Sequence, residues 1–185
     1  MSLIGYPFPD TQFKIINIHT GKEQDIGLDG EICISGPNIM LEYLEEPIET
    51  KNALTTIDGL TYLHTGDIGY IDSKGLLHYK SRLKRMIITS GYSVYPAHIE
   101  EILMKHPSVL NCAIIGIPDQ NKGEIVKAFI VLKENNSKVI AKGNIQKYLK
   151  KQLAKYEQPR EYTFIDEIPK TNLGKIAYKE LEKIN

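Results

Sequence analysis

Short runs of alternating apolar and polar residues characterise the first 80 residues of the chain, and this alternation is typical of half-buried strands. The runs are residues 13–18, 30–35, 68–71 and 76–79. Between the last two lies Asp72-Ser73-Lys74-Gly75, which is typical of a hairpin turn. An acidic segment at 42–49 contains Pro47 and is expected to form a short helix or loop on the surface. Together these pieces predict the end of a β-barrel-like subdomain.

The period of the pattern changes after Arg82. Pro96 occupies the position of a first-turn proline, and Ile99, Ile102 and Leu103 follow at helical spacing. The pattern predicts strands at 86–89, 109–117, 124–132 and 162–166, helices at 96–106, 142–155 and 177–184, and a loop at 169–174. This order predicts a compact C-terminal domain with a small sheet flanked by helices, so the expected fold class of the whole chain is α+β.

Composition places the chain among globular proteins. It has 185 residues, of which 42% are hydrophobic and 25% charged, so it can bury a core. No window approaches the roughly 18 to 20 consecutive apolar residues of a membrane span, which predicts no integral membrane segment. Cys33 and Cys112 lie in apolar runs without metal-ligand spacing. We therefore expect buried thiols, no metal site and a cytoplasmic protein.

The net charge of zero conceals a difference between the two ends of the chain. Residues 1–80 hold 5 basic and 12 acidic residues, whereas residues 133–185 hold 12 basic and 7 acidic residues. The basic end is compatible with a polyanionic ligand such as a nucleotide, or with a lysine-rich solvated helix face. Many of its lysines fall on the polar face of the helix predicted at 142–155, and no aromatic-studded basic groove is visible. Nucleic acid is therefore not an expected partner.

Three segments offer candidate chemistry. Thr65-Gly66-Asp67 reads as a turn whose carboxylate could accept hydrogen bonds from a vicinal diol such as a ribose, although Gly-Asp turns are commonly structural. Three cations lie within five residues in Ser81-Arg82-Leu83-Lys84-Arg85. The alternative interpretation of this segment is a charged linker without a binding role. Lys175 directly follows Gly174, the last residue of the loop at 169–174, and a mobile cation there could bind an anion. A lysine after such a glycine is also commonly a plain surface residue.

In order and spacing, these segments resemble the C-terminal portion of the adenylate-forming superfamily, which comprises acyl-CoA and aryl-CoA synthetases, peptide-synthetase adenylation domains and beetle luciferases. The matching motifs are Tyr62-x-x-Thr65-Gly66-Asp67, Arg82-x-Lys84-x-x-Ile87, Gly91-Tyr92-x-Val94-x-Pro96-x-x-Ile99-Glu100 and Pro169-Lys170-Thr171-x-x-Gly174-Lys175. Gly5-x-Pro7-x-Pro9, Gly30-Glu31-Ile32 and Gly36-Pro37-Asn38 also look like the family, so the resemblance covers nearly the whole chain. Ser81 and Leu41-Glu42-Tyr43 depart from the commoner family residues without removing a reacting group.

The resemblance implies a role for five residues. Asp67 would bind the ribose hydroxyls of ATP/AMP, and Arg82 would support the same nucleotide. Lys84 would be the hinge between the β-rich end of a large N-terminal domain at residues 1–83 and a small mobile C-terminal domain at residues 84–185. Gly91 would line the pantetheine tunnel of CoA, and Lys175 would be the catalytic cation that reaches the carboxylate and the α-phosphate during adenylation.

The function that the resemblance implies is that of an acid–thiol ligase, an AMP-forming acyl-CoA synthetase of the kind used in fatty acid metabolism. Its substrates would be a carboxylic acid, ATP and CoA, with Mg²⁺ bound mainly by a part of the large domain that this sequence does not contain. Because the family's phosphate loop and acyl pocket are also absent from the sequence, the chain alone is expected to be inactive. The alternatives are a peptide-synthetase adenylation domain, disfavoured because the sequence runs only ten residues past Lys175, and a non-catalytic nucleotide- or partner-binding module.

Overall fold

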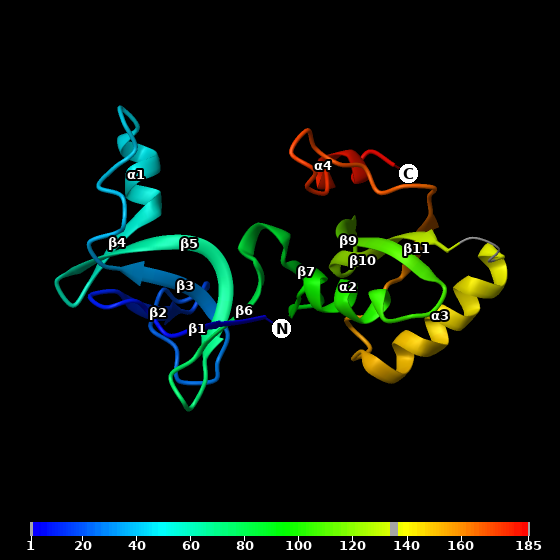
Figure 1. Cartoon of the computed structure of the whole chain (residues 1–185), viewed down its shortest axis with the longest axis horizontal. Helices are drawn as coiled ribbons and strands as arrows, with labels where there is room; N and C mark the ends of the chain where they lie inside the picture. The colour runs from blue at the N-terminus through cyan, green and yellow to red at the C-terminus, as the bar shows by residue number, and fades with distance from the viewer. Residues whose placement is uncertain (1, 134–136, 185) are drawn as a thin grey trace. The chain divides into compact units, whose positions relative to one another are not determined.

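A computed structural model describes residues 2–133 and 137–184, and its contacts divide the chain into two compact units, Met1–Lys84 and Arg85–Asn185. Each unit has its own sheet and its own cores (Figure 1). The elements of the first unit are β1 (Ser2–Gly5), β2 (Gln12–Ile16), β3 (Gly30–Ser35), α1 (Pro47–Ala53), β4 (Leu54–Ile57), β5 (Leu60–Ile71) and β6 (Leu77–Arg82). A 3₁₀ turn, η1 (Leu83–Arg85), spans the boundary between the units.

The first unit is built on an antiparallel sheet in the order β1-β6-β5-β3-β2, with β4 paired to β5. One face carries a cluster around Ile15, Ile32 and Leu77, and another cluster gathers Ile16, Cys33 and Tyr62. Within the described residues β1 pairs only with β6 and β2 only with β3, so this sheet is open and does not close into a barrel. The exposed β1 edge carries Leu3 and Ile4, each 56% exposed.

The hairpin of β4 and β5 was not expected from the sequence. Its two-residue turn consists of Asp58 and Gly59, both with positive φ (52° and 80°), which is the conformation that matches the twist of a tight hairpin. Residues 54–57 contain Thr55 and Thr56 side by side, so they show little apolar alternation. The predicted strand at 68–71 is in fact the last third of the twelve-residue β5.

The second unit holds a mixed sheet in the order β11-β10-β7-β8, with β9 also paired to β10. Its elements are β7 (Ile87–Thr89), β8 (Tyr92–Val94), α2 (Pro96–Met104), β9 (Val109–Asp119), β10 (Gly123–Leu132), α3 (Lys138–Gln152), β11 (Glu161–Phe164) and α4 (Tyr178–Leu181). Only the β10–β11 pair of the described sheet is parallel. The chain passes through α3 between these two strands, as a parallel crossover requires. The predicted α+β class is therefore confirmed.

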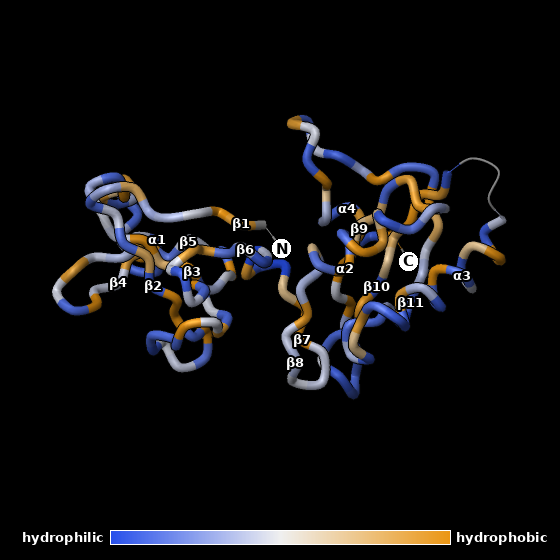
Figure 2. Tube along the Cα trace, turned by 60° about the horizontal axis from the view of Figure 1, so that its bottom comes forward, coloured by the Kyte–Doolittle hydropathy of each residue, from blue (hydrophilic) through white to orange (hydrophobic). Residues whose placement is uncertain are grey.

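Both faces of the β9–β10 pair are buried, which explains why these strands read as long apolar runs. Ile114 and Ile130 share one face with residues of α2 and α3, while Ala113 and Phe129 share the other with Leu181 of α4. Figure 2 shows the hydrophobic colouring along β9 and β10. Helices therefore cover both faces of the β9–β10 pair, and the loop between β11 and α4 is attached to this packed core.

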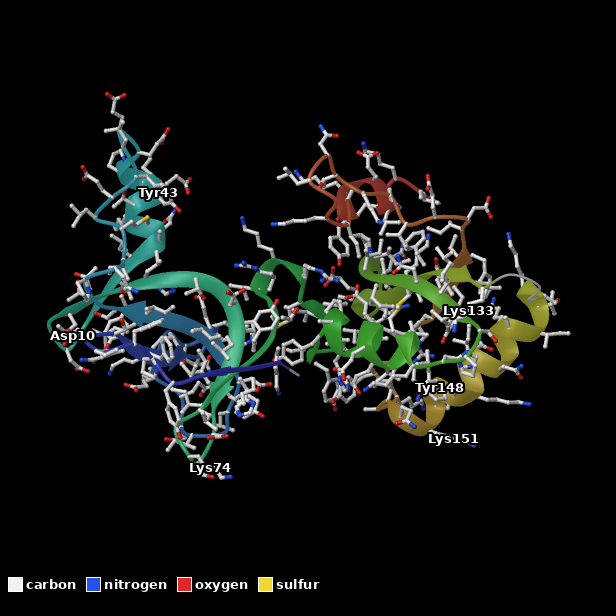
Figure 3. All side chains as sticks on the ribbon, viewed as in Figure 1. Asp10, Tyr43, Lys74, Lys133, Tyr148 and Lys151 are labelled. Carbon is white, nitrogen blue, oxygen red and sulfur yellow. The ribbon has the colours of Figure 1, made fainter. Side chains whose placement is uncertain are left out.

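Helix α3 begins four residues before the predicted position 142 and ends three residues before 155. Its buried residues, Ala141, Ile145 and Leu149, lie at helical spacing. Figure 3 labels Tyr148 and Lys151 on this helix: the Tyr148 ring contacts His106 edge-on, whereas Lys151 is exposed. Among the described residues no helix is long and apolar enough to cross a membrane.

Candidate functional site

Asp67 lies on a β-bulge, not on the turn that the sequence suggested. Strand β5 continues through this position, and Thr65, Gly66 and Asp67 together face the single residue Ile32 of β3. Gly66 has φ of +70°, which allows the extra residues to bulge out of the sheet. The prediction of a chain reversal was wrong because Thr-Gly-Asp reads as turn chemistry, whereas the β3 pairing on both sides keeps the strand extended.

Side chains hold the bulge in place. The Thr65 hydroxyl donates to the Ile32 carbonyl at 2.7 Å and accepts from the Asp67 amide at 3.1 Å. The Gly66 amide donates to Glu31 Oε1 at 3.0 Å. All three bonds are part-buried, so the backbone that carries Asp67 has a defined geometry.

Arg82 stands directly opposite Asp67 on β6. Its Nε lies 3.0 Å from Asp67 Oδ1, an ion-pair distance, while its Nη1 donates to the Thr65 carbonyl at 3.2 Å. The Oδ1 atom is buried, and the contact lacks the angle of a hydrogen bond, so within the described residues this oxygen accepts none. Burial raises the pKa of Asp67 above its usual range, Arg82 opposes that rise and Glu31 adds to it. The pair therefore presents a carboxylate with spare acceptor capacity beside a cation.

A cluster that was not predicted from the sequence lies next to this pair. His64 Nδ1 is 2.8 Å from Glu31 Oε2 and 3.4 Å from Cys33 Sγ, and this is the one group of three metal-type ligands that the described residues bring within 4.8 Å. Burial raises the pKa of the Cys33 thiol to about 12, so the thiol is protonated. The imidazole–carboxylate bond accounts for the geometry, and the mixed donor set is unlike the oxygen set that Mg²⁺ prefers. The signal in the sequence was the i, i+2 spacing of Glu31 and Cys33 on β3.

Gly91 forms a two-residue hairpin turn with Ser90 between β7 and β8. Both residues have positive φ, 50° for Ser90 and 81° for Gly91, as a type I′ turn requires. A Cβ atom at Gly91 would meet no heavy atom within 4 Å. The glycine is therefore needed for its backbone conformation and leaves an open surface at the turn.

A pocket of about 310 Å³ lies beside this turn. The rings of Tyr92 and Tyr156 stack there with centroids 4.5 Å apart and planes 10° apart. Lys122, Lys155 and Arg160 also line it, and none of its lining residues in the described chain is acidic. Cations beside aromatic faces suit an anionic aromatic ligand. The basic composition of this half was predicted from the sequence, but the pocket was not, because its residues come from three separate segments.

Lys175 is exposed on a tight loop between β11 and α4. An isolated bridge pairs Lys170 with Ile176, and the Thr171 amide donates to the Lys175 carbonyl at 2.7 Å. Gly174 has φ of +77°, as the predicted turning role requires. Among the described residues no hydrogen bond or ion pair uses the Lys175 ammonium. The loop therefore presents a cation that is available to a ligand.

The structure brings Asp67 and Arg82 together in the first unit and places Gly91 and Lys175 in the second. Lys84 is exposed and is the last residue of the first unit, one residue beyond the predicted boundary. Its role as a hinge stays a prediction, as do the roles of the other four residues.

Two family models match the chain: the AMP-binding enzyme model matches residues 1–44, and the AMP-binding enzyme C-terminal domain model matches residues 98–175. The chain belongs to the adenylate-forming superfamily. This confirms the resemblance, and the chain corresponds to a C-terminal portion of such enzymes. Among the predicted site residues, Lys175 falls within a matched region, whereas Asp67, Arg82, Lys84 and Gly91 lie between the two regions.

Curated relatives in this superfamily include ligases with different acceptors. The chain is 38% identical over 178 residues to a long-chain-fatty-acid–CoA ligase of Escherichia coli O157:H7, covering 96% of this chain and 30% of the relative. It is 40% identical over 175 residues to 4-coumarate–CoA ligase 1 of Oryza sativa, covering 94% and 30%. It is 38% identical over 181 residues to the fatty acid–[acyl-carrier-protein] ligase ScoC of Streptomyces coeruleorubidus, covering 98% and 34%. The chain thus spans about a third of the length of these relatives.

Solved structures of the superfamily agree in fold. ATP-bound MatB from Rhodopseudomonas palustris matches with a TM-score of 0.86 and 31% identity, covering 98% of this chain and 35% of that one. The amide bond synthetase McbA from Marinactinospora thermotolerans matches with a TM-score of 0.85 and 30% identity, covering 98% and 36%.

Proposed function

We propose that the chain is the C-terminal part of an ATP-dependent acyl-CoA ligase. Such an enzyme joins a carboxylic acid to AMP with release of pyrophosphate and then transfers the acyl group to the CoA thiol. The observation that carries the proposal is the 38–40% identity to CoA ligases over nearly the whole chain. Asp67, Arg82, Gly91 and Lys175 support it, because each lies in a local geometry suited to its assigned role.

Asp67 and Arg82 are assigned to the nucleotide. The Asp67 side chain is 26% exposed while its Oδ1 is buried beside Arg82, so the other carboxylate oxygen is the one proposed to accept hydrogen bonds from the two hydroxyls of a ribose. Arg82 is more than half exposed and can contact a ligand while it stays beside Asp67. The fixed bulge holds the carboxylate ready for this contact.

Lys175 is assigned to the adenylation step. A carboxylate that attacks the α-phosphate approaches a group that is already anionic, and a cation between them offsets this repulsion. An exposed ammonium on a loop closed by its own backbone hydrogen bonds is suited to that task. Mg²⁺ would accompany the ATP phosphates, and we assign none of the described residues to it.

CoA is the acceptor that the second unit favours. Its 310 Å³ pocket combines stacked tyrosines with three cations, which suits the anionic nucleotide end of CoA, while the open Gly91 turn beside it suits the pantetheine arm. ScoC, by its name, acts on an acyl carrier protein, so a carrier-protein thiol is the second candidate acceptor.

The test is direct assay of a longer protein that contains this chain. It is supplied with Mg-ATP, a panel of carboxylic acids and either CoA or an acyl carrier protein, and the thioesters are identified by mass spectrometry. Acyl-CoA formation for at least one acid is expected. Adenylate formation without any acyl-CoA, or acyl transfer to the carrier protein alone, would contradict the CoA assignment.

The 185-residue chain by itself is proposed to be inactive and to bind ATP weakly, because it supplies Asp67 and Arg82 but no glycine-rich phosphate loop. Calorimetry with Mg-ATP tests this on the chain alone. Sub-micromolar affinity would show that a complete nucleotide site exists within these residues.

A further inference from the structure

Arg85, the first residue of the second unit, is held by two different elements of that unit. Its Nη2 donates to Glu100 Oε1 on α2 at 2.7 Å, and its Cζ lies 3.9 Å from the centroid of the Tyr178 ring on α4. The Arg85 side chain is 25% exposed and that of Glu100 17%, so most of this ion pair is removed from water. A partly buried guanidinium with both an ionic and an aromatic partner has little freedom to move.

Glu100 extends this attachment into the sheet. The same Oε1 atom accepts from the Ile114 amide of β9 at 2.9 Å, and the Cys112 thiol donates to the Glu100 carbonyl at 3.6 Å. Because Cys112 and Ile114 belong to the main core of the unit, Arg85 is tied through Glu100 to that core.

Tyr178 connects Arg85 with the loop that carries Lys175. It is the first residue of α4 and lies three residues after Lys175. The backbone closes the stem of the loop just before it, since the Ala177 amide donates to the Pro169 carbonyl at 2.8 Å and Lys170 bridges to Ile176. A contact that fixes Tyr178 therefore also fixes the base of this closed loop. Figure 1 shows α2, β9 and α4, the three elements that meet in this set of contacts.

We propose that Arg85 is a positioning residue. It is the first residue after the proposed hinge, and it holds the Lys175 loop in place through its contact with Tyr178. Rotation is then absorbed at or before Lys84, and the loop moves with the second unit as one rigid piece. The inference rests on the proposed roles of Lys84 and Lys175. Loss of the contact between Arg85 and Tyr178 should weaken adenylation, because the ammonium would no longer be held where charge develops. It should spare thioester formation, because the Gly91 hairpin makes none of these contacts.

The first test uses the 185-residue chain and is independent of its activity. In Arg85→Ala, amide hydrogen exchange at Thr171, Gly174 and Ala177 should speed up by about tenfold or more, while exchange in the β9–β10 pair, apart from the Ile114 amide that donates to Glu100, stays unchanged. Lys179→Ala is the matched control, because it removes an exposed cation on α4, the helix that begins with Tyr178. Unchanged exchange in the loop of Arg85→Ala would overturn the proposal.

Two further variants separate the partners of Arg85. Arg85→Lys keeps a charge for Glu100 but loses the guanidinium that lies over the Tyr178 ring, and Tyr178→Leu keeps apolar bulk without the ring. Each should loosen the loop, and Arg85→Lys combined with Tyr178→Leu should be no looser than the worse single variant, because the two changes remove one contact. Arg85→Lys also serves if Arg85→Ala fails to fold. Fully additive effects would contradict the proposal.

The second test uses the longer enzyme in single-turnover assays. Arg85→Lys should slow acyl-adenylate formation by about tenfold and leave thioester formation from preformed acyl-adenylate and CoA near the wild-type rate. A looser loop with normal adenylation, or equal loss in both steps, would overturn the proposal. If the wild-type enzyme makes no adenylate, the proposed function fails, whereas the exchange data still decide whether Arg85 holds the loop.

Discussion

Asp67 illustrates how a candidate binding residue can be held at the expense of stability. Its carboxylate is partly buried, its Oδ1 accepts no hydrogen bond within the described residues, and a second carboxylate, Glu31, lies nearby. Each of these features disfavours the charged form, and only Arg82 opposes them. A nucleotide that donates hydroxyl hydrogen bonds to this carboxylate would favour its charged form, so function and stability should respond in opposite directions when the charge is removed.

Asp67→Asn tests this opposition. Because the folded pKa of Asp67 is raised above its ordinary value of 3.8, ionised Asp67 destabilises the folded state at neutral pH. The variant should therefore be as stable as the wild type or more stable, by up to about 1 kcal/mol, at pH 7. This advantage should shrink as the pH falls through the raised pKa and vanish where Asp67 is protonated in both states.

Urea unfolding between pH 3 and pH 8 measures this difference, and nucleotide binding to the longer protein should weaken at least tenfold in the same variant. Glu42→Gln, which removes an exposed carboxylate away from the bulge, is the control for a general charge effect. A variant that loses stability at pH 7 would contradict the account of Asp67.

Lys175→Ala addresses the reaction at the same scale. If Lys175 touches the α-phosphate only during adenylation, the change should slow acyl-adenylate formation in the longer enzyme by about 10²–10³-fold, the usual loss for one charge-stabilising donor. Thioester formation from preformed acyl-adenylate should stay near the wild-type rate. Single-turnover assays of each step provide the measurement, with Lys179→Ala as the control, and normal adenylation in Lys175→Ala would refute the assignment.

At the scale of the element, the β7–β8 hairpin depends on one backbone conformation. Gly91→Leu places a branched side chain at φ of 81°, which costs about 1–2 kcal/mol and adds bulk to an open surface. We expect thioester formation to fall by tenfold or more while adenylation is retained. Gly91→Asn is the matched control, because asparagine tolerates this conformation better than leucine. Failure of both variants in the adenylation step instead would show that the turn serves another purpose.

The elements best predicted from the sequence are those in which the apolar residues of one buried face repeat at the spacing of a strand or helix. Strand β3 has the predicted bounds, and β9, β10 and α2 lie close to theirs, because their buried faces repeat at the spacing of the element. Strands β1 and β4 were not predicted, since Ser2–Gly5 and Leu54–Ile57 are short and lie on the periphery of the sheet. Their strand character comes from pairing with β6 and β5, which no local pattern reports.

The residues of the candidate site also differ in whether the sequence predicts them. Motifs along the chain indicated Asp67, Arg82, Gly91 and Lys175, because each motif is local. The contact of His64 with Glu31 joins residues 33 apart, and it depends on the register of β3 against β5. Likewise the Arg85 guanidinium lies over the ring of Tyr178, a residue 93 positions further along the chain. Side-chain contacts between distant segments follow from the assembled fold and not from spacing.

At the scale of the whole molecule, the division at Lys84 makes a kinetic prediction. Proline at this position restricts φ and should favour one arrangement of the units in the longer enzyme. Lys84→Pro should then slow one half-reaction at least tenfold more than the other, because the two steps would require different arrangements. Lys84→Ala, which changes the side chain but leaves the backbone free, should affect both steps little. Equal loss of both steps in a folded Lys84→Pro protein would argue against the hinge.

The open sheet of the first unit has a consequence for the self-association of the chain in solution. The outer edge of β1 pairs with no other strand of the described chain, and it carries Leu3 and Ile4, both exposed. Unpaired backbone groups flanked by aliphatic side chains are a template for a strand from another molecule. The isolated 185-residue chain should therefore self-associate as its concentration rises, and Ile4→Lys should raise its solubility without changing the second unit.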